Sequence, residues 1–545
     1  MMIVPEPKMM KAGKKRYPFD GFSNLPPFLK REFEIKNGKW KIEKIDRVGN
    51  GLKITDGKVE IWGNEFTSYA TLIQIVRQFK DVLPEIEAEE SFNFKFRGYH
   101  LDIARGGVPN LKNFKSLLRW LFLLKYNYFA IYFEDLFPWK IDPKIGKRRG
   151  RLTEEELKEI IDYGKSLGIE VFPSLELTGH MEHILSLPKY HEFSEWHRPS
   201  EGCLDLSNKS ASDFAIKLLE EVVEFFPSKY IHIGGDETWA LGRGKSLNKK
   251  WEFQGYKLYE DHYAHMIEIV KSHGKVPMMW GDMLTGMYLS HEEAKKWQEV
   301  LQSKIWDEVA IANWDYSSNK KTFFAEKINS FGDKRKDSQI ACPGLSDWNT
   351  FYPDFKTALS NIKNFTNAAK EEKLPGFMVT SWGDDGQECL FSFLNPLILA
   401  TMEIAEGNGE WEEKWSALSG ENKEITNVRK IFGNSEISTM TLKRVLFGDL
   451  YPLYKLEDVK KIRDEFEKVL DDTKNIDLPD DLKFIKQMIE VALSKMNCKS
   501  RSSDFISLSN TYSKLWLKER KPEGLEYLLP RFWGMAGIAD LTGND

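Results

Sequence analysis

Cysteines, long hydrophobic runs and a strong charge of one sign are all scarce in this sequence, and each scarcity removes a class of protein. The four cysteines lie far apart with no Cys-x-x-Cys spacing, which argues against a zinc site or a disulfide framework. No apolar run reaches the roughly 18 residues of a membrane span, and residues 1–15 lack the apolar stretch of a signal peptide. The net charge of -5 implies no strong attraction to nucleic acid or anionic lipid. We therefore expect a reduced, cytoplasmic protein that binds neither nucleic acid nor membranes.

The length of 545 residues suggests two to four domains at about 150 residues per domain, although one α/β barrel can occupy 250 residues or more. Residues 1–95 are expected to form a small α+β domain. Leu52–Thr55 and Lys58–Trp62 alternate around Asp56-Gly57, which predicts a β-hairpin. A helix is predicted over residues 67–83, with one apolar face made of Leu72, Ile75, Val76, Phe79 and Leu83.

Residues 96–409 alternate short apolar strands with amphipathic helices eight times, which predicts a (β/α)8 TIM barrel in preference to a doubly wound sheet. Thr153 with Glu156 forms a capping-box pattern, and Gly168, Gly274 and Gly332 stand where helices should end. The predicted strands are Phe96–Ala104, Tyr126–Phe133, Ile169–Leu175, Lys229–Ile233, Lys275–Trp280, Val309–Trp314, Gln339–Cys342 and Gly376–Trp382.

Residues 410–545 are expected to form a helical domain. One predicted helix carries an apolar stripe made of Leu456, Val459, Ile462, Phe466 and Val469. Such a domain could complete the rim of a pocket or form a homodimer, and both possibilities stay open.

The most informative segment is His232-Ile233-Gly234-Gly235-Asp236-Glu237, which follows the fourth predicted strand. Two adjacent carboxylates raise each other's proton affinity, so one can act as an acid while the other stays ionised. Such a pair suits glycoside chemistry. The alternative for an isolated Asp-Glu pair is that Asp236 only caps the following turn or helix.

The other strand ends are also rich in polar and aromatic side chains, and barrel enzymes place their chemistry at this end. Flat aromatic surfaces beside carboxylates suit a sugar, which has apolar faces and a rim of hydroxyl groups. The aromatic strand ends are Trp280-Gly281-Asp282, Trp314-Asp315-Tyr316, Trp348-Asn349 and Trp382-Gly383-Asp384-Asp385.

Over residues 17–409 the sequence resembles the β-N-acetylhexosaminidases of glycoside hydrolase family 20, and helical tails like residues 410–545 occur in a bacterial subgroup of that family. The resemblance rests on Phe96-Arg97-Gly98-Tyr99-His100-Leu101-Asp102, on Pro173-Ser174-Leu175-Glu176-Leu177-Thr178-Gly179-His180, and on the segment that ends in Asp236-Glu237.

This resemblance implies an exo-acting enzyme that releases terminal β-linked N-acetylglucosamine or N-acetylgalactosamine with retention and without a cofactor or metal. Glu237 is implied as the general acid and then the base. The 2-acetamido oxygen of the substrate would attack the anomeric carbon and form an oxazolinium intermediate, a known exception to the two-carboxylate mechanism. Asp236 would orient the acetamido group and stabilise its positive charge. The expected substrates are oligosaccharides or glycoconjugates.

Further substrate contacts are implied residue by residue. Arg97 matches the family arginine that holds the 3- and 4-hydroxyl groups, although a salt bridge at the bottom of the barrel is the alternative. His180 matches a histidine paired with an aspartate after the second strand, here Asp135 or else Glu134. The remaining implied contacts are the pocket walls Trp280, Trp314 and Trp382, and Asp384, which would accept from the 4- or 6-hydroxyl.

The sequence also departs from the family pattern. Thr178 replaces the usual proline before Gly-His, and the second strand ends in Phe133-Glu134-Asp135-Leu136. The usual Tyr-Leu-Asp element is missing near Cys342-Pro343-Gly344, so Tyr316 becomes the candidate for the contact to the acetamido oxygen.

Three other functions are weighed against this interpretation. A metal-dependent barrel hydrolase using His232, His180 and the two carboxylates would need a better zinc signature than two isolated histidines. A catalytically silent sugar-binding protein would not need the carboxylate pair. A two-carboxylate β-glucosidase is the closest alternative, and aryl β-glucoside hydrolysis would reveal it.

Overall fold

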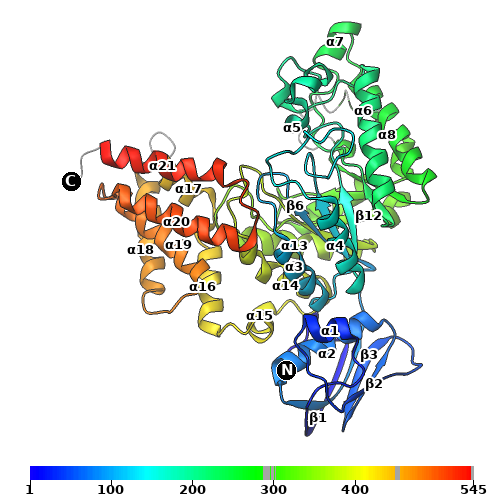
Figure 1. Ribbon diagram of the computed structural model, residues 1–545, viewed down its shortest axis with the longest axis vertical. Coiled ribbons are helices and arrows are strands. Elements are labelled where there is room, and N and C mark those ends of the chain that lie inside the picture. Colours follow the sequence, from blue (N-terminus) through cyan, green and yellow to red (C-terminus); the bar gives the residue numbers. More distant parts are fainter. Residues whose placement is uncertain (286–294, 296, 298–299, 301, 449–454, 542–545) are drawn as a thin grey trace.

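The computed structural model describes all 545 residues except 286–294, 296, 298–299, 301, 449–454 and 542–545. A closed barrel of parallel strands lies between an N-terminal sheet and a C-terminal group of helices (Figure 1). The barrel order is β10-β11-β12-β13-β6-β7-β8-β9. The TIM barrel predicted from the sequence is therefore confirmed.

All eight predicted barrel strands are present, and each lies within the residues predicted for it. Because the strands are parallel, their C-terminal ends meet at one rim of the barrel. The strands are β6 (Phe96–Asp102), β7 (Tyr128–Tyr132), β8 (Glu170–Ser174), β9 (Tyr230–His232), β10 (Val276–Trp280), β11 (Ala310–Trp314), β12 (Gln339–Cys342) and β13 (Gly376–Ser381).

Helices follow the strands, and their ends agree with the sequence signals. The capping box of Thr153 and Glu156 starts α4 (Glu154–Ser166), and Gly168, Gly274 and Gly332 adopt positive φ angles just after helices. The other barrel helices are α3 (Leu111–Leu123), α5 (Glu182–Leu185), α6 (Lys209–Phe225), α7 (Lys245–Lys250), α8 (Gly255–Ser272), α9 (Asp282–Thr285), α12 (Lys321–Ser330), α13 (Phe355–Glu371) and α14 (Asn395–Glu406).

The N-terminal sheet has the order β1-β5-β3-β4-β2, and the predicted hairpin is its antiparallel β3–β4 pair. The predicted helix is α2, but it ends at Phe79, so Leu83 belongs to β5 instead. Lys80 interrupts the helix with a φ of 56°. The elements are β1 (Met9–Pro18), α1 (Pro27–Glu32), β2 (Lys41–Lys44), β3 (Asn50–Thr55), β4 (Lys58–Trp62), α2 (Glu65–Phe79) and β5 (Val82–Glu90).

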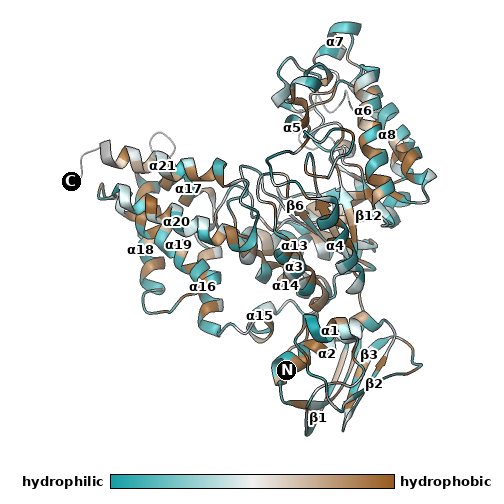
Figure 2. Ribbon diagram, viewed as in Figure 1, coloured by the Kyte–Doolittle hydropathy of each residue, from teal (hydrophilic) through white to brown (hydrophobic). Residues whose placement is uncertain are grey.

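The C-terminal helices bury their apolar residues against one another, so polar and apolar segments alternate along each helix (Figure 2). Tyr512 contacts both Phe484 and Phe532, with ring centroids 5.4 and 5.9 Å away. The domain boundaries at residues 95/96 and 409/410 stay a prediction. The helices are α15 (Trp411–Ser419), α16 (Lys423–Gly433), α17 (Met440–Phe447), α18 (Leu456–Asp472), α19 (Asp480–Met496), α20 (Ser502–Glu519) and α21 (Leu525–Leu541).

Aromatic rings fill the barrel interior near the N-terminal ends of its strands. Phe96 stacks on Tyr128 with ring centroids 4.0 Å apart, and Tyr230 meets both rings edge-on at 5.5 Å. This end of the barrel is therefore apolar, and polar side chains collect at the opposite rim. Within the described ranges, none of the helices combines the length and apolar composition needed to cross a membrane.

Candidate active site

The turn after β9 brings Asp236 and Glu237 to the C-terminal rim of the barrel. Gly234 and Gly235 have φ angles of 75° and 103°, a backbone region that favours glycine. A Cβ atom on Gly234 would lie 2.3 Å from Glu176 Oε2, so this position has no room for a side chain. Glu237 itself has a φ of 46°, which is uncommon for a residue other than glycine. Strained residues of this kind gather at functional sites.

His180 lies beside both catalytic candidates. Its Nε2 atom is 3.7 Å from Asp236 Oδ2 and 3.5 Å from Glu237 Oε2. Burial alone would lower the pKa of His180, but the charge of Asp236 and the hydrogen bond to Glu237 raise that pKa to about 10. The same hydrogen bond lowers the pKa of Glu237. In the unliganded protein, the proton shared by this pair therefore resides on His180.

Glu176 supports Asp236 from below. Its two carboxyl oxygens accept hydrogen bonds from the Gly235 N–H at 3.1 Å and from the Trp280 indole N–H at 3.0 Å. Burial, together with the nearby charge of Asp236, raises the pKa of Glu176 well above its ordinary value. Burial also raises the pKa of Asp236, but the charge of His180 and the hydrogen bond from Glu176 oppose that shift. Of these two hydrogen-bonded carboxyl groups, Glu176 has the more strongly raised pKa and is therefore the better proton carrier.

Asp282, at the end of β10, holds the backbone of Glu237. Its Oδ2 atom accepts the Glu237 N–H at 3.0 Å. Burial and the charge of Asp236 raise the pKa of Asp282 to about 8. The hydrogen bond holds the left-handed backbone of Glu237, whose side chain stays 39% exposed. Solvent and substrate can therefore reach Glu237.

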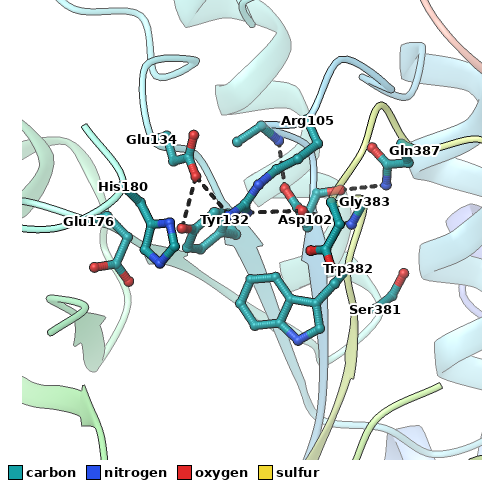
Figure 3. A network of polar contacts seen from close by, with 12 residues as sticks. Asp102, Arg105, Tyr132, Glu134, Glu176, His180, Ser381, Trp382, Gly383 and Gln387 are labelled. Carbon is teal, nitrogen blue, oxygen red and sulfur yellow. Dashed lines mark hydrogen bonds and ion pairs between the residues drawn. The ribbon is translucent and has the colours of Figure 1, made fainter. Parts of the chain in front are cut away.

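Arg105 lies at this rim, and Figure 3 shows its contacts. Its guanidinium pairs with Asp102 Oδ2 at 3.1 Å and with Glu134 Oε1 at 3.2 Å, and it lies 5.0 Å from the ring centroid of Tyr132. It is also 5.7 Å from the centroid of Trp382. No role was predicted for Arg105 from the sequence, although its place three residues beyond the end of β6 was a usable signal.

The structure corrects the prediction for Arg97. Arg97 lies at the N-terminal end of β6, and its guanidinium donates to Phe94 O at 2.7 Å and to Lys125 O at 3.0 Å. Its side chain also lies over the ring of Phe92, with the guanidinium carbon 4.0 Å from the centroid. A barrel strand separates its two ends by its whole length, so Arg97 belongs to the bottom of the barrel and Arg105 to the site.

The partner of His180 is also corrected. Asp135 Oδ2 accepts from Arg149 Nε at 2.9 Å, so this carboxylate pairs with Arg149. Glu134, the alternative named for this role, joins the network of Arg105 and accepts from the Tyr132 hydroxyl at 3.0 Å. Burial raises the pKa of Glu134 to about 8, against the opposing charge of Arg105. Both residues lie in the turn after β7, where Glu134 has a φ of 44°, and only Glu134 joins the network of Arg105.

The predicted aromatic residues gather at the rim, but they differ in exposure. Trp382 is partly exposed, and its indole N–H donates to the Tyr316 hydroxyl at 2.7 Å. The Tyr316 ring lies 5.2 Å from that of Trp314. Trp280 is completely buried, with its ring 5.6 Å from that of Trp382, so it supports the pocket from below and does not line it. Asp384 is exposed at the same rim.

One group of described residues has the side-chain geometry of a cation site. Glu134, Glu182 and His183 each offer a ligand atom, and these atoms lie within 4.8 Å of one another. The metal-dependent alternative required His232 instead. His232 is completely buried, with its ring 4.3 Å from that of Trp280, and its Nδ1 atom accepts the Gly234 N–H at 3.1 Å. The geometry therefore gives no support to a metal held by His232.

Replacing His180 with asparagine should move the alkaline limb of the pH profile of kcat/KM to lower pH. In the parent protein, the pair of His180 and Glu237 keeps its proton until the His180 pKa of about 10. In the variant that proton must sit on Glu237, and an unperturbed glutamate has a pKa of about 4.3. Measuring kcat/KM from acidic to alkaline pH tests this. An unchanged alkaline limb would show that His180 does not share the catalytic proton.

Comparison with known proteins places this geometry in a family. Residues 94–405 match the glycosyl hydrolase family 20 catalytic domain. Hexosaminidase D from Homo sapiens is 24% identical over 301 residues, which are 53% of this chain and 60% of that protein. A β-hexosaminidase from Vibrio furnissii is 30% identical over 270 residues, which are 41% of this chain and 43% of that protein. The chain thus spans less than two thirds of the length of either relative.

Solved structures show the same fold. An exo β-N-acetylglucosaminidase from Vibrio harveyi, in complex with N-acetylglucosamine, has a TM-score of 0.58 at 16% identity and covers 77% of this chain and 76% of its own. A β-N-acetylhexosaminidase from Bacteroides fragilis has a TM-score of 0.58 at 20% identity and covers 75% of this chain and 92% of its own.

Proposed function

We propose that this chain, which belongs to glycosyl hydrolase family 20, is an exo-acting β-N-acetylhexosaminidase that releases terminal β-linked N-acetylglucosamine or N-acetylgalactosamine. The observation that carries the proposal is the adjacent pair of Asp236 and Glu237 at the barrel rim, bridged by His180. Partly exposed Trp382 and Tyr316 offer the aromatic surface that a sugar ring needs. A cytoplasmic location stays part of the proposal.

Glu237 is assigned the proton transfers. As the glycosidic bond breaks, Glu237 donates its proton to the leaving oxygen, and afterwards it takes a proton from the attacking water. His180 is close enough to supply and recover that proton, at 3.5 Å from Glu237 Oε2. Glu237 is the more exposed member of the carboxylate pair, which suits contact with the leaving group.

Asp236 is assigned the acetamido group. The substrate's acetamido oxygen attacks the anomeric carbon as the glycosidic bond breaks, and the resulting oxazolinium ion carries a positive charge. Asp236 Oδ1 is buried and accepts no hydrogen bond from an N–H or hydroxyl group of the described residues, so it is available for the acetamido N–H. The proton on Glu176 keeps Asp236 ionised, and the buried charge stabilises the cation.

Arg105 takes the role first assigned to Arg97. Replacing Arg105 with alanine should raise KM for the terminal sugar by about tenfold or more, because hydrogen bonds to charged groups contribute about 1.5–3 kcal/mol. Arg97→Ala is the matched control, and it should lower the thermal stability while the folded protein keeps its KM. Steady-state kinetics and thermal unfolding of both variants separate the two roles. A raised KM in the Arg97 variant alone would reverse the assignment.

The function itself is tested by hydrolysis of an aryl β-N-acetylglucosaminide with and without a thiazoline mimic of the cyclised intermediate. We expect turnover that the thiazoline inhibits competitively and strongly. Turnover that the thiazoline does not affect would leave a glycosidase but remove the role given to Asp236. Faster hydrolysis of the aryl β-glucoside would favour the two-carboxylate β-glucosidase, and no turnover on any aryl glycoside would favour a silent sugar-binding protein.

A further inference from the structure

The segment that follows β13 begins with two pocket residues, Trp382 and Asp384, and has a backbone that needs support. Asp384 and Gln387 have φ angles of 34° and 57°, in the left-handed region that residues other than glycine rarely adopt. Such conformations persist only where the surroundings hold them in place. The contacts of residues 383–392 therefore determine where Trp382 and Asp384 lie.

The barrel holds the first part of this segment through Asp102. Asp102 Oδ2 accepts the Gly383 N–H at 2.8 Å, and Asp102 O accepts from Gln387 Nε2 at 2.8 Å (Figure 3). The same Asp102 carboxylate pairs with Arg105. The arginine of the site and the start of the segment thus share one anchor.

The C-terminal helices hold the rest. Arg531 on α21 and Lys443 on α17 both pair with Asp385, at 3.0 and 2.7 Å. The same two cations also pair with Glu388, whose side chain is completely buried. A buried carboxylate without these cations would be costly, so the two pairs bind the segment firmly to the helices.

Backbone groups of residues 387–392 are held by a third C-terminal helix, α20. Charged and hydroxyl side chains of α20 and of the residue after it reach the segment's carbonyl and N–H groups. The contacts are Arg520 Nη1 to Gln387 O at 2.8 Å, the Tyr512 hydroxyl to Glu388 O at 2.8 Å, the Phe391 N–H to Glu519 at 2.8 Å, and the Ser392 N–H to Glu519 at 3.1 Å. Figure 1 shows α17, α20 and α21 gathered together beside the barrel.

We propose that Arg531 is a positioning residue which, through Asp385 and Glu388, holds Asp384 and Trp382 where they meet the terminal sugar. The C-terminal helices are then part of sugar recognition, although none of their residues needs to touch the substrate. This inference rests on the proposed function, because it assumes that Asp384 accepts from a sugar hydroxyl.

The test compares Arg531→Ala and Arg531→Lys with the parent enzyme on the aryl glycosides of N-acetylglucosamine and its 4-epimer, N-acetylgalactosamine. Loss of Arg531 should raise KM by about tenfold, below the roughly 10²-fold that a 1 Å misplacement can cost. It should also change the ratio of kcat/KM between the two sugars, with a smaller effect on kcat. Arg531→Lys should restore part of the loss, because lysine keeps the charge.

Lys518→Ala is the matched control, since Lys518 lies on α20 and its side chain pairs only with Asp480 across the surface in the described contacts. Lys518→Ala should leave KM and the ratio of kcat/KM between the two sugars unchanged. If Arg531→Ala fails to fold, Lys443→Ala replaces it. This variant should fold because Arg531 still pairs with Asp385, and it should raise KM because one of the two cations that hold the segment is lost. Asp384→Ala should shift the sugar ratio in the same sense as Arg531→Ala.

The outcomes separate this inference from the proposed function. An active parent enzyme whose Arg531 and Lys443 variants keep the parent KM and sugar ratio would overturn the inference alone. The inference alone is also overturned if the variants lose kcat equally on both sugars, in proportion to the loss of folded protein. It is likewise overturned if Asp384→Ala leaves the ratio of kcat/KM between the two sugars unchanged. A parent protein inactive on both sugars would overturn the proposed function and the inference with it.

Discussion

Glu237→Gln should lower kcat by about 10²- to 10⁴-fold on substrates with poor leaving groups, which is the usual contribution of general acid–base catalysis. Glutamine keeps the shape of glutamate but has no acidic proton for the leaving oxygen. A substrate with an activated aryl leaving group needs little protonation, so its loss should be much smaller. The size of the loss should therefore grow with the pKa of the leaving group.

This expectation is checked by kcat/KM across a series of aryl glycosides of increasing leaving-group pKa, for the parent enzyme and for Glu237→Gln. Glu195→Gln is a suitable control, because Glu195 is a buried carboxylate that accepts hydrogen bonds from another loop, from the Gly244 N–H at 2.8 Å and from the Ser246 hydroxyl. An equal loss across the series would contradict the acid role of Glu237. It would leave a general structural effect as the explanation.

Asp236→Asn should lower kcat by about 10²- to 10³-fold with little change in KM, as expected when an electrostatic partner of the transition state is removed. Asparagine fits the same space but carries no charge to stabilise the oxazolinium ion. Its amide can also present an N–H where the acetamido N–H must donate. The loss should appear on activated and unactivated substrates alike, in contrast to Glu237→Gln.

Steady-state kinetics on one aryl N-acetylglucosaminide, together with thiazoline inhibition constants, measure this effect. The variant should bind the thiazoline more weakly, since the proposed role has Asp236 hold the ring nitrogen of the cyclised intermediate. Asp135→Asn is the matched control, because Asp135 is a buried aspartate in the turn after β7, two strands away from β9, and it pairs with Arg149. A rise in KM with an unchanged kcat would refute the stabilising role of Asp236.

The strand and helix pattern was readable from the sequence because it depends on local features. Alternating apolar strands and amphipathic helices predicted the barrel, and capping residues predicted where helices begin and end. The one clear error in the N-terminal region, the helix drawn as far as Leu83, arose because apolar periodicity continued past Lys80, where the backbone actually turns. Sequence periodicity does not reveal a single residue with a positive φ.

Side-chain direction was harder to predict. Arg97 and Arg105 lie eight positions apart, at the start of β6 and just beyond its end, so the predicted strand already placed Arg105 at the C-terminal rim, although the family resemblance favoured Arg97. Glu134 and Asp135 are neighbours in the turn after β7, and they join different networks, one with Arg105 and the other with Arg149. Trp280 stands at a strand end as predicted, yet its ring is completely buried.

The sequence by itself determined the family, the barrel and the pair of carboxylates after the fourth barrel strand, because each depends on residues close together in the chain. Only the tertiary structure decided which of Glu134 and Asp135 pairs with Arg105, that Trp280 is completely buried, and that the C-terminal helices hold the segment after Asp384. These depend on turn geometry, burial and contacts between residues more than a hundred positions apart. Such features arise only when distant segments pack together.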